Sequence, residues 1–293
     1  MISIVIRTKN EREYVTEVLS AVYAQDDEEI FEVFVIDSGS IDGTQDAVRT
    51  FPVHLVEIPA ERFSFGYALN LGAQLAHGRI VVYISAHCTP TTHRWLRNLV
   101  EPLRSDPALV ASYGRQEPRN GVNPFEEPGL HLAFPADRSQ QPLALFSNAN
   151  CAARRTALLR NPFDETLTSS EDLVWRLTFQ PDEIIYVPEA SVYHSHPINF
   201  RYWAQRFERD GMATMVMQRR YGIINPYLGR NDTFALAARD FFRSCCGRSF
   251  FFLLKGYFRF IPLVPFFEAV RVWSMARGLR RGKATKLSTS SRL

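Results

Sequence analysis

The stretch Gly78–Pro90 constrains the fold of this chain more than any other. Its residues Ile80–Ile84 form an unbroken run of β-branched and aromatic side chains, which is typical of a strand buried on both faces of a parallel sheet. The run ends in small and polar residues, and Pro90 cannot continue a central strand. Ligands bind outside the carboxyl ends of strands in open α/β sheets. Ser85 and His87, which share one side of an extended backbone, are therefore predicted to lie at a binding site.

Strand-like and helix-like segments alternate along the chain. Strands are predicted at 2–6, 31–36, 53–58, 80–84, 109–113, 143–146, 184–187 and 191–194. Helical spacing of apolar residues occurs at 11–24, 67–76, 95–104 and 171–179. This alternation indicates an α/β fold with a mostly parallel sheet and helices on both faces. The aperiodic segment 116–141 is predicted to be a long functional or mobile loop.

The charges are distributed unevenly over the 293 residues. Residues 1–200 contain 16 Lys and Arg against 26 Asp and Glu, whereas residues 201–293 contain 18 against 5. A basic tail behind an acidic body predicts an anionic partner, either nucleic acid or a membrane surface. The four cysteines have no paired spacing, which indicates neither a disulfide framework nor a zinc site. The chain opens directly on a strand without a leader pattern, so a cytoplasmic location is expected.

Six motifs carry a family resemblance when they are taken in order. They are Ser3–Glu11, Asp37–Thr44, Phe63–Gly72, Ser147–Asn150, the pair Glu171-Asp172, and Val192–His196. This set resembles the family 2 glycosyltransferases of the GT-A fold, and more narrowly the rhamnosyltransferase-like members. The resemblance covers roughly residues 1–220. We therefore expect a GT-A glycosyltransferase domain at 1–220 and a basic, aromatic-rich helical tail at 221–293.

The resemblance implies that a sugar, rhamnose being favoured, passes with inversion from a nucleotide-diphosphate donor to a hydroxyl of a saccharide or lipid-linked saccharide. Without it, Glu171 and Asp172 would be read as acids favoured by a helix N-terminus; with it, Asp172 is the expected base and Glu171 orients its neighbours. The expected donor-binding residues are Arg7, Thr8, Asp37, Ser85 and His87. Asn148 and Asn150 either hold the acceptor or close a turn.

The chain departs from its family at the metal site. Similar enzymes carry Asp-x-Asp where this chain has Ser85-Ala86-His87. Imidazole is a poor ligand for Mg²⁺ but a good one for borderline transition metals. The resemblance implies a metal-binding histidine after the acid pair, so the candidate ligands for a divalent ion, Mn²⁺ or Mg²⁺, are His194 and His196 together with His87. The alternatives are a structural role, or direct contact of the histidines with the donor diphosphate.

The tail from 250 to 273 is aromatic, yet charged residues interrupt it, and its longest uncharged piece, 260–267, is too short to cross a membrane. We expect peripheral binding to an anionic membrane surface; the alternative is helix packing. A nucleic-acid-binding function is not expected because no recognition module is present. No GxGxxG follows the first strand, which disfavours a dinucleotide oxidoreductase. The missing aspartates leave a catalytically silent sugar-nucleotide-binding protein as the second hypothesis.

Overall fold

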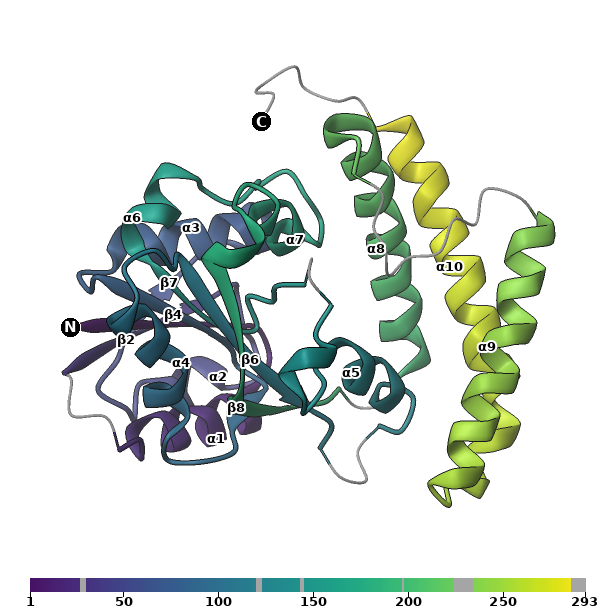
Figure 1. The fold of residues 1–293 in the computed structure, drawn as a ribbon, viewed down its shortest axis with the longest axis horizontal. Helices are drawn as coiled ribbons and strands as arrows, with labels where there is room; N and C mark the ends of the chain where they lie inside the picture. Colours follow the sequence, from purple (N-terminus) through teal and green to yellow (C-terminus); the bar gives the residue numbers. More distant parts are fainter. Residues whose placement is uncertain (27–29, 120–122, 143–144, 197, 224–233, 286–293) are drawn as a thin grey trace. The chain divides into compact units, whose positions relative to one another are not determined.

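A mixed sheet organises the first part of the chain (Figure 1). The computed structural model describes residues 1–26, 30–119, 123–142, 145–196, 198–223 and 234–285. Within these residues eight strands form one sheet in the order β3-β2-β1-β4-β7-β6-β8-β5. The strands are β1 Ile2–Thr8, β2 Phe31–Asp37, β3 His54–Glu57, β4 Ile80–Ser85, β5 Cys88–Pro90, β6 Ala111–Glu117, β7 Asn150–Arg154 and β8 Ile184–His194.

The strand pairing places the predicted site residues at one edge of the sheet. β1 is parallel to both β2 and β4, β2 is parallel to β3, and β6 is parallel to β8. β7 is antiparallel to β4 and β6, and β5 is antiparallel to β8. The register sets Arg7 opposite Ser85 and Thr8 opposite Asp37. The carboxyl ends of β1, β2 and β4 therefore meet, as the alternating pattern predicts.

Helices cover both faces of the sheet (Figure 1). One face packs against α1 Arg12–Tyr23, α2 Thr44–Val48 and α4 Trp95–Ser105. The other packs against α3 Phe65–Leu75, α6 Arg155–Arg160 and α7 Glu171–Arg176. Each face of the sheet has its own hydrophobic core, and alternate residues of β1 point into the two cores. Ile4 and Ile6 pack in the core on the first face and Val5 in the core on the second. Each such side chain contributes about 1.5–3 kcal/mol by leaving water.

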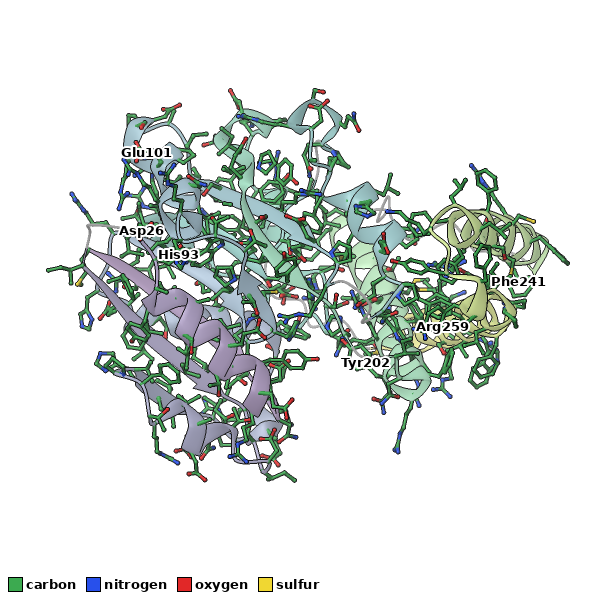
Figure 2. The ribbon with its side chains drawn as sticks, turned by 90° about the horizontal axis from the view of Figure 1, so that it is seen from below. Asp26, His93, Glu101, Tyr202, Phe241 and Arg259 are labelled. Atoms are coloured by element: carbon green, nitrogen blue, oxygen red, sulfur yellow. The ribbon has the colours of Figure 1, made fainter. Side chains whose placement is uncertain are left out.

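The backbone also joins helices of the first face directly. Asp26 follows α1 and His93 precedes α4, and the backbone N–H of Asp26 donates to the carbonyl oxygen of His93 at 2.8 Å (Figure 2). The side chain of Gln25 donates to the carbonyl oxygen of Thr92 at 3.1 Å. These bonds connect the end of one helix to the start of another about seventy residues later.

Three predicted elements differ from the observed ones. The strand expected at 143–146 is absent at 145–146, while 143–144 lie outside the described residues; the strand there is β7, Asn150–Arg154. The segment expected to be an aperiodic loop contains α5 Glu127–Ala133 and the 3₁₀ turn η2 Arg138–Gln140. The two strands expected between 184 and 194 form the single strand β8, which continues through Pro188 because its pairing with β6 shifts register there. Pairing with neighbours overrides local propensity in each strand.

Among the described residues, 167–170, 198–223 and 234–285 form a second compact unit, distinct from the unit that precedes residue 197. Its helices are α8 Phe200–Tyr221, α9 Phe234–Leu254, the 3₁₀ helix η4 Phe258–Leu263 and α10 Val264–Ala284. A Cβ at Gly278 of α10 would lie 1.9 Å from the carbonyl oxygen of Glu208 in α8, and one at Gly211 2.4 Å from that of Met275. Only glycine permits so close an approach of two helix backbones.

None of the helices in the described part of the chain combines the length and apolar character that crossing a bilayer requires. The division into a domain at 1–220 and a tail at 221–293 stays a prediction.

Candidate functional site

The carboxyl end of β1 brings Arg7 to the edge of the sheet beside two polar partners. The Arg7 Nη2 donates to the side-chain oxygen of Asn148 at 2.7 Å and lies 3.5 Å from Ser85 Oγ at the end of β4. The guanidinium carbon sits 5.2 Å from the centre of the Phe65 ring, within cation–π range. Arg7 therefore connects the strand ends to a residue 141 positions later in the chain.

Asn148 extends this connection to the acid pair at the start of α7. Its side-chain nitrogen donates to Glu171 Oε1 at 2.6 Å, and its backbone N–H lies 3.4 Å from Asp172 Oδ2. The second oxygen of Asp172 accepts from the backbone N–H of Leu173 at 2.9 Å. The structure thus brings together Arg7, Asn148, Glu171 and Asp172, which the sequence had assigned to separate donor, acceptor and catalytic roles.

The environment of Asp172 favours its protonated form more than water does. Burial, and secondly the charge of the neighbouring Glu171, raises the pKa of Asp172 to about 7. The N–H groups of Asn148 and Leu173 and the charge of Arg7 act in the opposite direction. A carboxylate with a pKa near neutrality is suited to accept a proton from a hydroxyl group.

Asp37 and Thr8 lie at the same edge, at the ends of β2 and β1. The buried Asp37 carboxylate accepts from the backbone N–H groups of Gly39 at 3.1 Å and Ser40 at 3.0 Å, and from Gln45 Nε2 at 2.7 Å. Asp37 thereby holds its own loop, in which Gly39 adopts a φ of 83°. The Thr8 hydroxyl is buried without a hydrogen-bond partner among the described residues. A contact of either side chain with a nucleotide stays a prediction.

Asn150 is fully buried in the interior of the sheet. Its oxygen accepts from the indole N–H of Trp95 at 2.9 Å, and its nitrogen donates to the carbonyl oxygens of Ala190 at 2.8 Å and Arg115 at 3.2 Å. These bonds tie β7 to α4, β8 and β6. The geometry favours a structural role for Asn150 over acceptor binding, whereas Asn148 lies directly against the acid pair.

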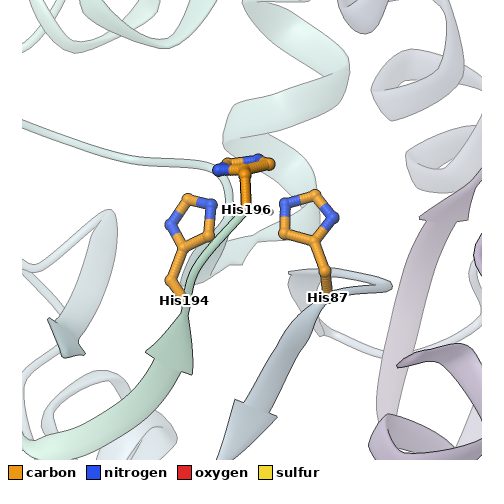
Figure 3. A group of neighbouring side chains, drawn as sticks. All are labelled: His87, His194 and His196. Atoms are coloured by element: carbon orange, nitrogen blue, oxygen red, sulfur yellow. The ribbon is translucent and has the colours of Figure 1, made fainter. Parts of the chain in front are cut away.

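Three histidines converge at the carboxyl ends of β4 and β8 (Figure 3). His87 lies in the turn between β4 and β5, and His194 and His196 lie at and beyond the end of β8. The ring centroids are 5.0 Å apart for His87 and His194, 4.7 Å for His87 and His196, and 4.9 Å for the remaining pair. One nitrogen from each ring lies within 4.8 Å of the other two. In Figure 3 ring nitrogens of His87 and His194 point toward each other.

The extended backbone expected from Ser85 to His87 is not observed. Residues 86 and 87 form a turn, so Ser85 lies toward Arg7 while His87 lies toward α1 and β8. The turn redirects the chain into β5, which pairs with β8 so that Cys88 stands opposite His194. This pairing is what brings His87 to the other two histidines.

Each of the three imidazoles is held from outside by an oxygen acceptor. The Nδ1 atom lies 2.5 Å from Glu11 Oε1 in His87, 2.5 Å from Gln116 Oε1 in His194 and 2.7 Å from Glu126 Oε1 in His196. Histidines that bind metal ions characteristically donate their second ring nitrogen to such an acceptor, which fixes tautomer and orientation. The donor set and its surroundings therefore fit a divalent transition-metal ion.

Sequence reasoning missed the acceptors Glu11, Gln116 and Glu126. Glu11 closes the motif that begins at Ser3, so its place after the first strand could have suggested a functional role. Gln116 ends β6 and Glu126 precedes α5, in the segment that the sequence indicated as loop. No local signal connects either residue with the histidines.

A family model described as "Glycosyl transferase family 2" matches residues 3–168, more than half of the chain. The O-antigen chain rhamnosyltransferase WbaN of Salmonella anatum is 25% identical over 214 residues, which cover 68% of this chain and 65% of that protein. The chain thus spans slightly less than two thirds of the length of this relative.

Two solved structures share the fold. The mannosyltransferase PcManGT from Pyrobaculum calidifontis, in complex with GDP-Man and Mn²⁺, is 19% identical; the match covers 96% of this chain and 86% of that one, with a TM-score of 0.65. The glucosyl-3-phosphoglycerate synthase from Mycobacterium tuberculosis, in complex with UDP, is 22% identical, with coverage of 78% and 83% and a TM-score of 0.57. These similarities confirm the predicted GT-A fold.

Proposed function

The chain belongs to glycosyl transferase family 2. We propose that it transfers a sugar from a nucleotide-diphosphate donor to an acceptor hydroxyl with inversion, and that the favoured sugar is rhamnose. The acceptor is a saccharide or a lipid-linked saccharide of cell-surface polysaccharide or glycolipid synthesis. The observation that carries the proposal is the partly buried carboxylate of Asp172, with its raised pKa, beside the Asn148–Arg7 connection.

The proposed reaction is a single displacement. The acceptor oxygen forms a bond to the anomeric carbon while the bond from that carbon to the diphosphate oxygen breaks, and the hydroxyl proton passes to Asp172. Glu171 and Asn148 orient the site through their hydrogen bond. The guanidinium of Arg7 lies close enough to lower the pKa of Asp172, so its positive charge helps to keep that carboxylate in the unprotonated form that accepts the proton.

We assign His87, His194 and His196 as the residues that would hold a divalent metal ion. Such an ion, when bound, would neutralise charge on the leaving diphosphate. Glu11, Gln116 and Glu126 keep the three imidazoles in position from outside. The Pyrobaculum calidifontis mannosyltransferase, which shares the fold, was solved with Mn²⁺.

The test replaces the base without changing its size. Asp172→Asn cannot accept a proton, so turnover should fall by about 10²–10⁴-fold while donor binding, measured as the rise in unfolding temperature with a panel of nucleotide sugars, is retained. Asp182→Asn in the exposed η3 turn, Pro181–Glu183, removes the same charge away from the site and should leave turnover unchanged. Activity of Asp172→Asn within a few-fold of the wild type would remove Asp172 from the role.

The second candidate is a sugar-nucleotide-binding protein without catalysis. It is suggested by Ser85-Ala86-His87, which lacks the two carboxylates of the family. A nucleotide sugar that raises the unfolding temperature of the wild type, yet is neither hydrolysed nor transferred with Mn²⁺ present, would favour this candidate over the enzyme.

A further inference from the structure

Several charged side chains of the tail are engaged in ion pairs inside the second unit. Arg277 Nε donates to Glu208 Oε2 at 2.7 Å, and Arg281 Nη1 lies 2.5 Å from the other oxygen of the same carboxylate. The fully buried Glu268 accepts from Arg248 at 2.8 Å and from Arg271 at 2.6 Å. These pairs hold the helices together, so the positive excess of the tail is only partly available to an outside partner.

The aromatic side chains divide in the same way. Trp203, Phe252 and Phe267 are buried between the helices. The turn that joins α9 to α10, which lies at one end of this helix pair (Figure 1), instead exposes its apolar side chains. We call residues 250–266 the α9–α10 tip. Its exposed large apolar side chains are Phe250 at 62%, Leu253 at 51%, Leu254 at 71%, Phe258 at 64%, Leu263 at 39% and Phe266 at 55%.

The charges at the α9–α10 tip are all positive. Lys255 and Arg259 lie among its exposed apolar residues, and the sequence contains no Asp or Glu from 241 to 267. The Lys255 ammonium lies 5.7 Å from the centre of the Phe251 ring and the Arg259 guanidinium 4.7 Å from that of Phe260. Apolar side chains interleaved with cations are the composition of a surface that lies in the headgroup region of a membrane.

We propose that the α9–α10 tip docks on an anionic lipid bilayer. Phe250, Leu254 and Phe258 enter the boundary between headgroups and acyl chains, while Lys255 and Arg259 contact lipid phosphates. A bilayer matches the tip better than a second copy of the same tip, because a two-fold contact would bring the cations of both copies together. The tip contains none of the residues assigned to the proposed transfer reaction.

The experiment uses the full chain and vesicles of phosphatidylcholine, with and without about a third of phosphatidylglycerol. The triple variant Phe250→Gln, Leu254→Gln, Phe258→Gln should weaken sedimentation with the anionic vesicles by about tenfold or more, because three apolar contacts are lost. The matched control is Phe242→Gln, which replaces a residue 68% exposed on the same helix, about 18 Å from Leu254 along the axis. The control should bind like the wild type.

A second measurement does not depend on polar substitution. Phe258→Trp keeps the tip apolar, and its added fluorescence should be quenched by brominated lipids, whereas that of Phe242→Trp should not. The proposal would be overturned if the wild-type protein did not bind anionic vesicles, or if the triple variant bound them as well as the wild type. Equal quenching of Trp at positions 258 and 242 would also overturn it. If the wild type forms oligomers and does not bind vesicles, and the triple variant no longer forms oligomers, the tip is a contact between copies instead. Nucleotide-sugar stabilisation of the triple variant should equal that of the wild type, which separates this test from that of the transferase function.

Discussion

Asn148 is the residue on which the candidate site depends most directly. A carboxamide carries a donor and an acceptor on one planar group, so it can bind the Arg7 guanidinium and the Glu171 carboxylate at once. A carboxylate at this position would repel Glu171, and an aliphatic side chain would leave both partners without the bond. The same residue offers its backbone N–H to Asp172. Cation, amide and acid pair are therefore coupled through a single position.

The first prediction at the residue scale concerns the pH dependence of activity. Asp172 must be unprotonated to accept a proton, so activity should fall as the pH drops below its pKa of about 7. The charge of Arg7 lowers this pKa, and Arg7→Gln should raise it further, shifting the rising limb of kcat/KM upward by about half to one pH unit. Arg62→Gln, which removes a cation that sits over Tyr67 instead, is the control. If the rising limb of the kcat/KM profile stayed at the same pH in Arg7→Gln, or moved to lower pH, the coupling of Arg7 to Asp172 would be contradicted.

The second residue-scale prediction concerns the metal. Transferase activity lost in EDTA should return with Mn²⁺ more than with Mg²⁺, because imidazole suits borderline transition metals. His87→Ala should lose this stimulation and should also weaken Mn²⁺ binding measured directly with nucleoside diphosphate present. His93→Ala, an exposed histidine whose ring bonds to the carbonyl oxygen of Ala24, should behave like the wild type. Full activity in EDTA would leave the histidines to act on the diphosphate without an ion.

At the scale of elements, close contact between α8 and α10 gives the second unit its packing. Gly211, Gly278 and Gly282 each face the backbone of the opposite helix at distances that leave no room for a Cβ. Arg219 of α8 also donates to the carbonyl oxygens of Gly282 at 2.9 Å, Lys283 at 3.0 Å and Thr285 at 2.9 Å. The Gly282 oxygen also accepts from the backbone N–H of Thr285 at 3.4 Å, so Arg219 adds to the bonds that satisfy carbonyl groups at the end of α10. The glycines along the contact and Arg219 at the end of α10 thus both hold α8 and α10 together.

Gly278→Ala should therefore destabilise the second unit. The added Cβ would lie 1.9 Å from a backbone oxygen that cannot move alone, so the free energy of unfolding should fall by about 1–3 kcal/mol. Gly247→Ala is the matched control, because it lies inside α9 with nothing within 4 Å of its Cβ position; it should raise the free energy by about 0.5–1 kcal/mol. Denaturant unfolding followed by circular dichroism measures both. If the two variants had equal free energies of unfolding, the backbones of α8 and α10 could move apart to admit the Cβ without loss of stability.

Elements were predictable where burial leaves a strong local pattern. β1, β2 and β4 are runs of β-branched residues, and the apolar spacing of α1 and α4 is regular. β7 was missed because Asn-Cys-Ala-Ala-Arg has little strand propensity of its own. It is a strand because β4 and β6 hold it on both sides. α5 was missed because prolines and polar residues surround its seven positions.

At the scale of the whole molecule, charge separates along the chain. The first 200 residues are acidic and the rest are basic, so an electrostatic contribution to vesicle binding should depend on ionic strength. Raising the salt from about 0.05 M to about 0.5 M shortens the screening length to a few ångströms. Binding of the full chain to anionic vesicles should then weaken several-fold but not vanish, because apolar insertion is not screened. Vesicles of phosphatidylcholine alone serve as the control, and binding to them should depend little on salt. If binding to anionic vesicles were equally independent of salt, electrostatic attraction would not contribute to it.

The fold class, the family and the residues at the strand ends were predictable before folding is considered, because apolar periodicity reports local burial and the six motifs keep their order along the chain. Which of those residues meet depends on how the strands are arranged in the folded protein. Arg7 reaches Asn148 across 141 positions, and His87 reaches His194 through the pairing of β5 with β8. Strand order and register set such contacts, and no local pattern encodes them. The raised pKa of Asp172 likewise follows from burial and a neighbouring charge, which exist only once the chain is folded.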